Sequence, residues 1–293
     1  MGPGDGLPTV DPMGEAEPNP DPLHRWNIAT PARSRLSGVS MSGFADRTVS
    51  PLDLGVVPYP AVTLAVDLSD DLEVVDEATG RGDGGAVSFG PGSNAVRVRG
   101  RSVEGLQVRM SPVVAHAVLG PGAAIDGGLV SLEDLWGRDA HRFREQLRDA
   151  PTWDDRFAIA ETAIARRVEI GRAVDPELVH TWDRMVGSGG RVRVGRVAEE
   201  LGWGRKRLWS RFRSQLGLTP KQAARLIRFD RAVHRLAAGH GAATVAAEGG
   251  YADQPHLNRE VKAFTGLTPS AVALAPWLAV DDVAWAPPHP ATS

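Results

Sequence analysis

The sequence predicts an α+β protein: a mainly antiparallel, β-rich N-terminal domain with some helices, followed by an all-α C-terminal domain with two helix-turn-helix units. Three observations support this fold class. Apolar and polar residues alternate with period two between about residues 26 and 110, as in half-buried strands. Apolar residues then recur every three or four positions, which is typical of amphipathic helices. Finally, a helix-glycine-helix pattern occurs twice near the C-terminal end.

The N-terminal residues 1–24 are rich in Pro, Gly and Asp, and lack the cationic start and apolar run of a signal peptide. We therefore expect a disordered segment there. No run approaches the roughly 18 apolar residues of a membrane span, so no membrane contact is expected. The chain has no cysteine, which excludes disulfides and thiolate metal sites and fits a reducing, cytoplasmic location.

The period-two alternation predicts strands in the N-terminal half. Its clearest segments are residues 62–68, 86–89, 95–98 and 106–110. Glycine-rich clusters at 80–85 and 90–94 lie between these segments and predict hairpin or loop connections. Neither cluster continues into a phosphate-binding loop or a dinucleotide-binding helix, so nucleotide binding has little support and no cofactor is expected.

Helices are expected after the strands, the first at 112–119. Ser131 is a capping residue for a helix that leads toward Leu147, and Thr152 caps the next one. Asp175, followed by proline, starts a further helix. These signals place the β-rich domain with its helical C-terminal part at 25–172, the helical domain at 173–275 and a flexible tail at 276–293.

The repeat joins two copies of one pattern. Val-Ala-Glu-Glu-Leu-Gly-Trp at 197–203 returns as Val-Ala-Ala-Glu-Gly-Gly-Tyr at 245–251, and Gly-Leu-Thr-Pro closes both copies. Each copy predicts a helix, a glycine turn and a second helix. Between the copies, Thr219 followed by proline and Gln222 predicts a capped helix that runs to about Ala238, roughly 28 Å long. Successive major-groove faces of DNA are roughly 34 Å apart, which is a comparable distance.

Charge is segregated along the chain. Residues 189–275 contain 15 Lys and Arg against 6 Asp and Glu, a net charge of +9, whereas the remainder has 18 against 30, a net charge of −12. The overall charge of −3 therefore conceals a basic module joined to an acidic one. Such segregation indicates that only the basic module meets a polyanion.

Two helix faces are candidates for that contact. Turning Leu208 and Phe212 inward exposes the opposite face of the second helix of the first copy, and Leu257 and Val261 do the same in the second copy. The predicted DNA-binding residues are Arg205, Lys206, Arg207, Trp209, Ser210, Arg213, Gln254, His256, Asn258, Arg259 and Lys262. Arg suits guanine and Asn or Gln suits adenine, whereas charges at helix ends often hold phosphates.

Each of these assignments has a structural alternative. A basic helix face is often only solvated, although duplication, glycine turns and clustered charge together favour DNA binding. Trp209 could pack against a neighbouring helix instead of touching DNA, and His256 could form a hydrogen bond in the cap region. Trp203 and Tyr251, which directly follow the glycines, are expected to be core residues.

The segment 197–220, the connecting helix, and Gly-Tyr-Ala-Asp-Gln-Pro-His-Leu at 250–257 with Gly-Leu-Thr-Pro at 266–269 resemble the AraC/XylS transcriptional regulators. The resemblance implies a bipartite domain of about seven helices, whose third and sixth enter adjacent major grooves. It also implies that the N-terminal part senses an effector or dimerises. Gly204 stands where the family often has a capping serine, and Leu257 replaces a common phenylalanine.

The resemblance implies a sequence-specific regulator whose partner is promoter or operator DNA. RNA polymerase, a small-molecule effector and a second copy of the chain are its further candidate partners. An enzyme has little support, because the histidines lack metal-ligand spacing and no Gly-x-Ser-x-Gly turn occurs. Two alternatives remain: an architectural or recombination-associated DNA binder whose N-terminal half only assembles protomers, and a helical protein-interaction module.

Overall fold

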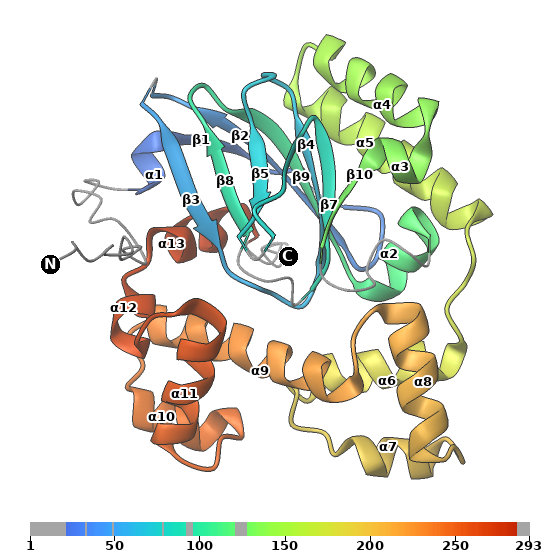
Figure 1. The fold of residues 1–293 in the computed structure, drawn as a ribbon, viewed down its shortest axis with the longest axis vertical. Coiled ribbons are helices and arrows are strands. Elements are labelled where there is room, and N and C mark those ends of the chain that lie inside the picture. Colours follow the sequence, from blue (N-terminus) through green and yellow to red (C-terminus); the bar gives the residue numbers. More distant parts are fainter. Residues whose placement is uncertain are drawn as a thin grey trace, which may run out of the picture.

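The computed structural model describes residues 22–285, apart from residues 33, 49, 78, 92–95 and 121–127. Within this part, strands dominate up to Met110 and helices dominate from Pro112 onward. Figure 1 shows two sheets in the upper part of the molecule, helices α2 to α5 beside them, and the remaining helices mostly beneath. The predicted α+β class, with an antiparallel N-terminal part and a helical C-terminal part, is confirmed.

The two sheets are antiparallel throughout. The larger has the strand order β1-β2-β9-β4-β7-β10 and the smaller has the order β3-β8-β5-β6. Together they bring strands from the whole N-terminal half face to face. The strands are β1 (Trp26–Ala29), β2 (Val39–Asp46), β3 (Leu52–Val56), β4 (Val62–Asp67), β5 (Glu73–Asp76), β6 (Gly82–Gly84), β7 (Ala86–Phe89), β8 (Val96–Gly100), β9 (Glu104–Met110) and β10 (Leu129–Ser131).

Strand β4 is buried at every position because both faces of its sheet are covered. Its residues Leu64 and Val66 belong to a core shared with the helices, whereas Ala65 packs with side chains of the smaller sheet. Because successive side chains of a strand point to opposite faces of the sheet, alternate residues of β4 belong to two different cores. The second core encloses a cavity, described below.

Four helices cover the outer face of the larger sheet. They are α2 (Pro112–Leu119), α3 (Leu132–Trp136), α4 (Arg138–Asp149) and α5 (Trp153–Ile170). Phe143 and Ile164 are buried against the sheet. The Ser131 and Thr152 side chains cap α3 and α5, as predicted. The helix expected to run from Ser131 toward Leu147 is instead divided, because Gly137 has a φ of 59°, which a continuous helix does not allow.

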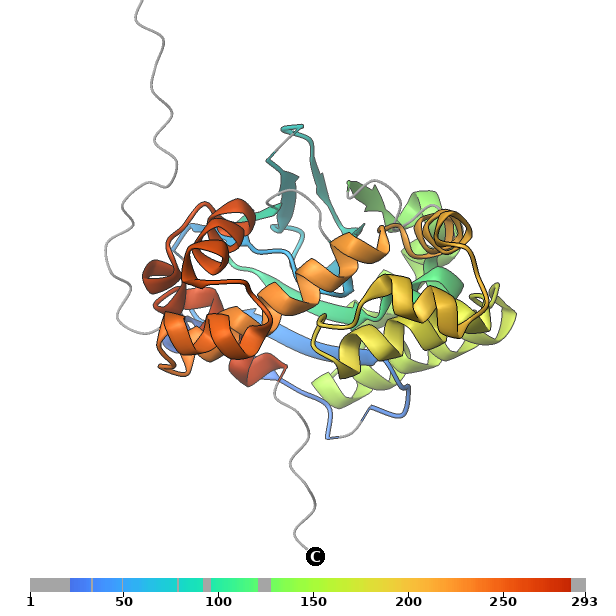
Figure 2. The same ribbon diagram turned by 90° about the horizontal axis from the view of Figure 1, so that it is seen from below.

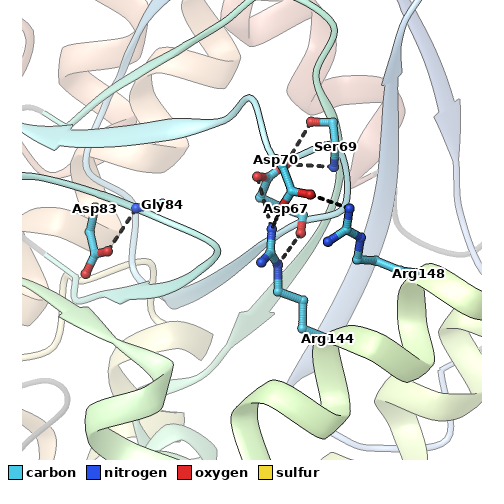
Figure 3. Close-up of polar contacts among 7 residues, drawn as sticks. All are labelled: Asp67, Ser69, Asp70, Asp83, Gly84, Arg144 and Arg148. Carbon is cyan, nitrogen blue, oxygen red and sulfur yellow. Dashed lines mark hydrogen bonds and ion pairs between the residues drawn. The ribbon is translucent and has the colours of Figure 1, made fainter.

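An arginine pair ties α4 to the end of β4 (Figure 3). Arg144 Nε donates to the Asp67 carbonyl oxygen at 2.8 Å, and Arg144 Nη2 donates to Asp70 Oδ1 at 2.5 Å. Arg148 donates to the other oxygen of Asp70, and these hydrogen bonds hold the pKa of Asp70 below its usual value. This corner fixes helix to sheet at the side of the molecule that lies away from the C-terminal helices (Figure 1).

The C-terminal helices form two small cores joined by one long helix. They are α6 (Pro176–Gly187), α7 (Val194–Glu200), α8 (Arg205–Leu216), α9 (Pro220–Ala237), α10 (Ala242–Gly249), α11 (Gln254–Thr265), α12 (Pro269–Ala273) and α13 (Pro276–Ala284). Helix α9 gives Ala223 and Ile227 to the core of the first unit, and Phe229 and Val233 to the core of the second. Seen from below, this orange helix crosses the molecule between the two groups of helices (Figure 2).

Some expectations about chain segments are wrong. Residues 82–84 of the glycine-rich cluster form β6, because Val74 and its neighbours in β5 offer an open edge for pairing. The tail expected from residue 276 begins with a helix, α13, which is held by contacts with the N-terminal strands. Of the segment 1–24 that was expected to be disordered, residues 22–24 belong to the short helix α1 (Pro22–Arg25). Residues 1–21, the end of the tail at 286–293 and most of the loop at 90–94 lie outside the described residues.

Candidate DNA-binding surface

Helices α8 and α11 are the second helices of the two repeat copies. In α8, Leu208, Phe212 and Leu216 are fully buried and define its inner face. In α11, Leu257 and Val261 do the same. Both helices end at a glycine with left-handed backbone, at φ 75° and 72°, and each is followed by a threonine-capped helix. The sequence repeat is thus a structural repeat.

The starts of the two helices differ. Asp253 accepts a hydrogen bond from the His256 backbone N–H at 2.7 Å and caps α11. Gly204 gives α8 no side-chain cap, as its departure from the family pattern predicts. The connecting helix α9 has the full predicted capping box, in which the Thr219 and Gln222 side chains bond each other's backbone N–H.

All the predicted DNA-binding residues of α8 and α11 point away from the two cores. Ten of them are exposed and His256 is half-buried. Trp209 is 38% exposed and borders the cleft described below, so its ring is only partly covered by the protein. The His256 ring accepts a hydrogen bond from the Ala252 N–H at 3.3 Å and meets the edge of the Tyr251 ring, which supports the cap-region alternative for this residue.

The two expected core aromatics behave differently. Tyr251 is buried, and burial raises the pKa of its hydroxyl. Trp203 is only half-buried, and the guanidinium of Arg207 lies 4.2 Å from the centroid of its ring. Arg207 is therefore held by a cation–π contact at the start of α8.

A cleft of about 860 Å³ lies between the two units. It brings together three predicted residues, Trp209 from α8 and His256 and Arg259 from α11. The other predicted residues do not line this cleft but lie on the exposed faces of the same helices. Its floor is lined by basic residues that the sequence analysis did not single out, namely Arg191, Arg193, Lys221, Arg225 and Arg228.

One acidic residue in the cleft was also missed. Glu260 of α11 is 4% exposed, accepts a hydrogen bond from Arg225 Nε at 2.9 Å and lies 3.7 Å from Arg228 Nη2. It therefore binds α11 to α9. The available signal was its position, because residue 260 lies three positions after Leu257 and thus on the apolar stripe of the helix.

Two arginine contacts hold the helices of the domain in place. Arg191 Nη1 donates to the Glu248 carbonyl oxygen at 3.2 Å and so links the segment before α7 to the end of α10. Asp175 occupies the cap position of α6, as predicted, but its carboxylate does not cap the helix. It accepts a hydrogen bond from Arg211 Nε of α8 at 2.9 Å instead, because Arg211 competes for the same oxygens.

The N-terminal sheets enclose a second hollow, of about 100 Å³, with mostly apolar walls. Arg109 of β9 is its one strongly basic lining residue among those described. The Arg109 guanidinium lies 3.8 Å from the Tyr59 ring centroid and 4.1 Å from that of Trp285, and Nη2 donates to Asp281 Oδ1 at 2.7 Å. Burial raises the pKa of Tyr59. This hollow is called the sheet cavity below.

In the described part of the chain, no three His, Cys, Asp or Glu side chains gather in a way that could hold a metal ion. Among the same residues, no helix combines the length and the apolar character that a membrane span requires.

Comparison with known proteins gives one family match. Residues 197–274 match a family model described as a helix-turn-helix domain, and no curated protein matches the chain. ToxT from Vibrio cholerae has a TM-score of 0.47 and 12% identity, over 82% of this chain and 98% of that one. The C-terminal domain of AraT, a response regulator from Geobacillus stearothermophilus, has a TM-score of 0.33 and 19% identity, over 34% and 86%. The AraC-like transcriptional activator CuxR has a TM-score of 0.25 and 16% identity, over 77% and 91%.

The matched residues run from within α7 to the end of α12. They contain both copies of the repeat, the connecting helix α9 and the cleft residues from Trp209 to Glu260. The C-terminal part of this chain is therefore a helix-turn-helix domain that contains two copies of the motif.

Proposed function

We propose that this protein is a sequence-specific transcription regulator that binds double-stranded DNA through α8 and α11 and responds to a small-molecule effector. The observation that carries the DNA-binding part is the attachment of two exposed basic helix faces to one helix. Because α9 belongs to the cores of both units, it sets the distance and orientation between the two faces. Its 18 residues span roughly 27 Å, close to one turn of DNA.

Each face has residues suited to bases and residues suited to phosphates. Arg205, Lys206 and Ser210 of α8 lie where base edges would meet the helices, as do Asn258 and Arg259 of α11. Arg213 and Lys262 lie further along their helices, where phosphates would hold the protein in register. The two units together would cover about 20 base pairs.

The cleft between the units supports the same role. Its basic floor is only partly neutralised by Glu260, so the DNA backbone would cross it in a favourable potential. Trp209 stands at this cleft with an exposed ring that could meet sugar or a thymine methyl group.

The effector part of the proposal rests on the sheet cavity. It combines apolar walls with one buried cation, a pattern typical of sites for small organic molecules. The unit at 25–172 would thus sense the effector, the unit at 173–275 would bind the operator, and RNA polymerase would be the partner through which transcription changes.

The test is selection of bound sites from random DNA with the full chain. A sequence-specific regulator enriches a site with two elements about 10 base pairs apart. An architectural DNA binder would give salt-dependent binding without an enriched sequence, and a protein-interaction module would give no salt-dependent binding. Either of these last two results would overturn the proposal.

A further inference from the structure

Helix α13 follows the DNA-binding domain in sequence but packs on the N-terminal half. It contacts α1 and β1, and the hydroxyl of Ser42 in β2 donates to the Ala284 carbonyl oxygen. Figure 1 shows α13 directly below the strands and above α12. Trp277, Asp281 and Trp285 line the sheet cavity from this side. The end of the described chain thus closes the cavity.

The contacts of Arg109 indicate what α13 replaces. The Trp285 ring covers one side of the guanidinium and Asp281 accepts a hydrogen bond from one of its terminal nitrogens. Arg109 Nε is buried and has no hydrogen-bond partner among the described residues. Asp281 therefore uses only some of the N–H donors of the guanidinium. A carboxylate that is free to orient itself could accept hydrogen bonds from the guanidinium through both of its oxygens. Together the indole and the carboxylate imitate an aromatic acid.

The same helix reaches the connector of the DNA-binding domain. Asp282 Oδ1 lies 3.2 Å from His234 Nδ1 of α9, and Leu278 is buried in one core with Phe229 of α9. Burial raises the pKa of Asp230 on α9, and the negative charge of Asp281 raises it further. Residues 281 and 282 thus connect the cavity cation to the helix that sets the spacing of the two reading helices.

We propose that α13 is a tethered competitor of the effector: an aromatic carboxylic acid binds Arg109 in place of Asp281 and Trp285, displaces α13 and releases α9. The effect on DNA binding rests on the proposed function. The displacement of α13 by the ligand does not. Charge balance is kept, because one carboxylate replaces another on the buried guanidinium. Release removes the contacts of Leu278 and Asp282 with α9, so the second unit can adjust when both reading helices dock on DNA.

Calorimetric titration tests the competition, with sodium 1-naphthoate as the probe. We expect the full chain with both Asp281→Asn and Trp285→Ala to bind naphthoate about tenfold more tightly than the parent, because the apparent affinity is proportional to the fraction of molecules in which α13 does not occupy the cavity. Val283→Ala, at a position that is 45% exposed on the same helix, is the control and should match the parent. The neutral 1-naphthamide should bind at least about tenfold more weakly than naphthoate, because it cannot pair with Arg109. Equal affinities for parent and double variant, equal affinities for acid and amide, or no binding of naphthoate would each overturn the proposal.

Hydrogen exchange of the full chain without DNA tests the displacement. Naphthoate should speed exchange of the backbone amides of α13, and unchanged or slower exchange there would contradict displacement. DNA affinity is measured separately. Naphthoate should raise it in the parent but not in the double variant, in which α13 no longer holds Arg109. If α13 is displaced while DNA affinity stays constant, the coupling to α9 is wrong. If no form of the protein binds DNA, the proposed function fails, while the titration and exchange results still decide the competition.

Discussion

Glu260 and Arg225 connect the second reading helix to the connector, with Arg225 Nε donating to Glu260 Oε2 at 2.9 Å. The Glu260 side chain is only 3% exposed, whereas that of Arg225 is 39% exposed. The carboxylate is therefore removed from water and depends on Arg225 and Arg228 for its stability. This contact fixes the angle between α11 and α9, and its loss has a measurable consequence.

Glu260→Ala should lower the free energy of unfolding by about 2–3 kcal/mol. Breaking a fully buried ion pair costs about 3–5 kcal/mol, and the exposure of Arg225 reduces this value. Urea unfolding measures the change, with Glu199→Ala at an exposed position of α7 as the matched control. Equal losses in the two variants would show that Glu260 does not stabilise the domain.

Arg259→Ala should weaken discrimination between the selected site and a scrambled site by about 1–3 kcal/mol, because a bidentate arginine-guanine contact would be lost. The Arg259 side chain is exposed, and its Nε donates a hydrogen bond to the Pro255 carbonyl oxygen of its own helix at 3.3 Å. Competition binding at fixed salt measures the effect. An unchanged preference would remove Arg259 from the base-reading residues.

Arg213→Ala should reduce the salt dependence of DNA binding with little effect on sequence preference. The slope of log K against log salt is negative, and loss of one phosphate contact reduces its magnitude by about 0.9. Arg211→Ala, on the same helix, is the control, because Arg211 is not among the predicted DNA-binding residues and its guanidinium lies 2.8 Å from Asp175. If Arg213→Ala has the same slope as the parent, Arg213 does not hold a phosphate.

Acid should destabilise the protein through His116 of α2. Burial lowers the pKa of this residue, and the nearby positive charge of Arg172 lowers it further. The folded protein thus binds the proton less readily than the unfolded chain. Stability is therefore fully present above the ordinary histidine pKa of about 6.5, and is lost as pH falls through that value toward the lower folded value. His116→Gln should flatten the dependence of the unfolding midpoint on pH between about 5 and 7.5, and an unchanged dependence would point to another group.

Local signals predicted much of the helical half. Thr219 and Asp253 are capping residues in the sequence and capping residues in the structure, because a cap depends on neighbours within three positions. The repeated glycines likewise mark helix ends. Position 260 is different, since its burial becomes clear only when Arg225 and Arg228 approach from another helix.

Long-range contacts explain what the sequence did not reveal. Helix α13 is stabilised by partners such as Arg109, which lies 172 positions before Asp281. The strand at 82–84 contains only Gly and Asp, so pairing with β5 and not side-chain pattern makes it a strand. Asp175 occupies a cap position, yet the approach of Arg211 redirects its carboxylate. Such outcomes depend on tertiary proximity, which residue spacing does not encode.

Hydroxyl-radical footprinting of the full chain on its selected site tests most directly whether one helix holds two readers on adjacent turns of DNA. The expected result is two protected segments on the same face of the duplex, about 10 base pairs apart. Lys206→Ala should weaken one segment and Arg259→Ala the other, since the two residues lie on different reading helices. A single protected segment, or two that respond alike to both substitutions, would contradict this arrangement.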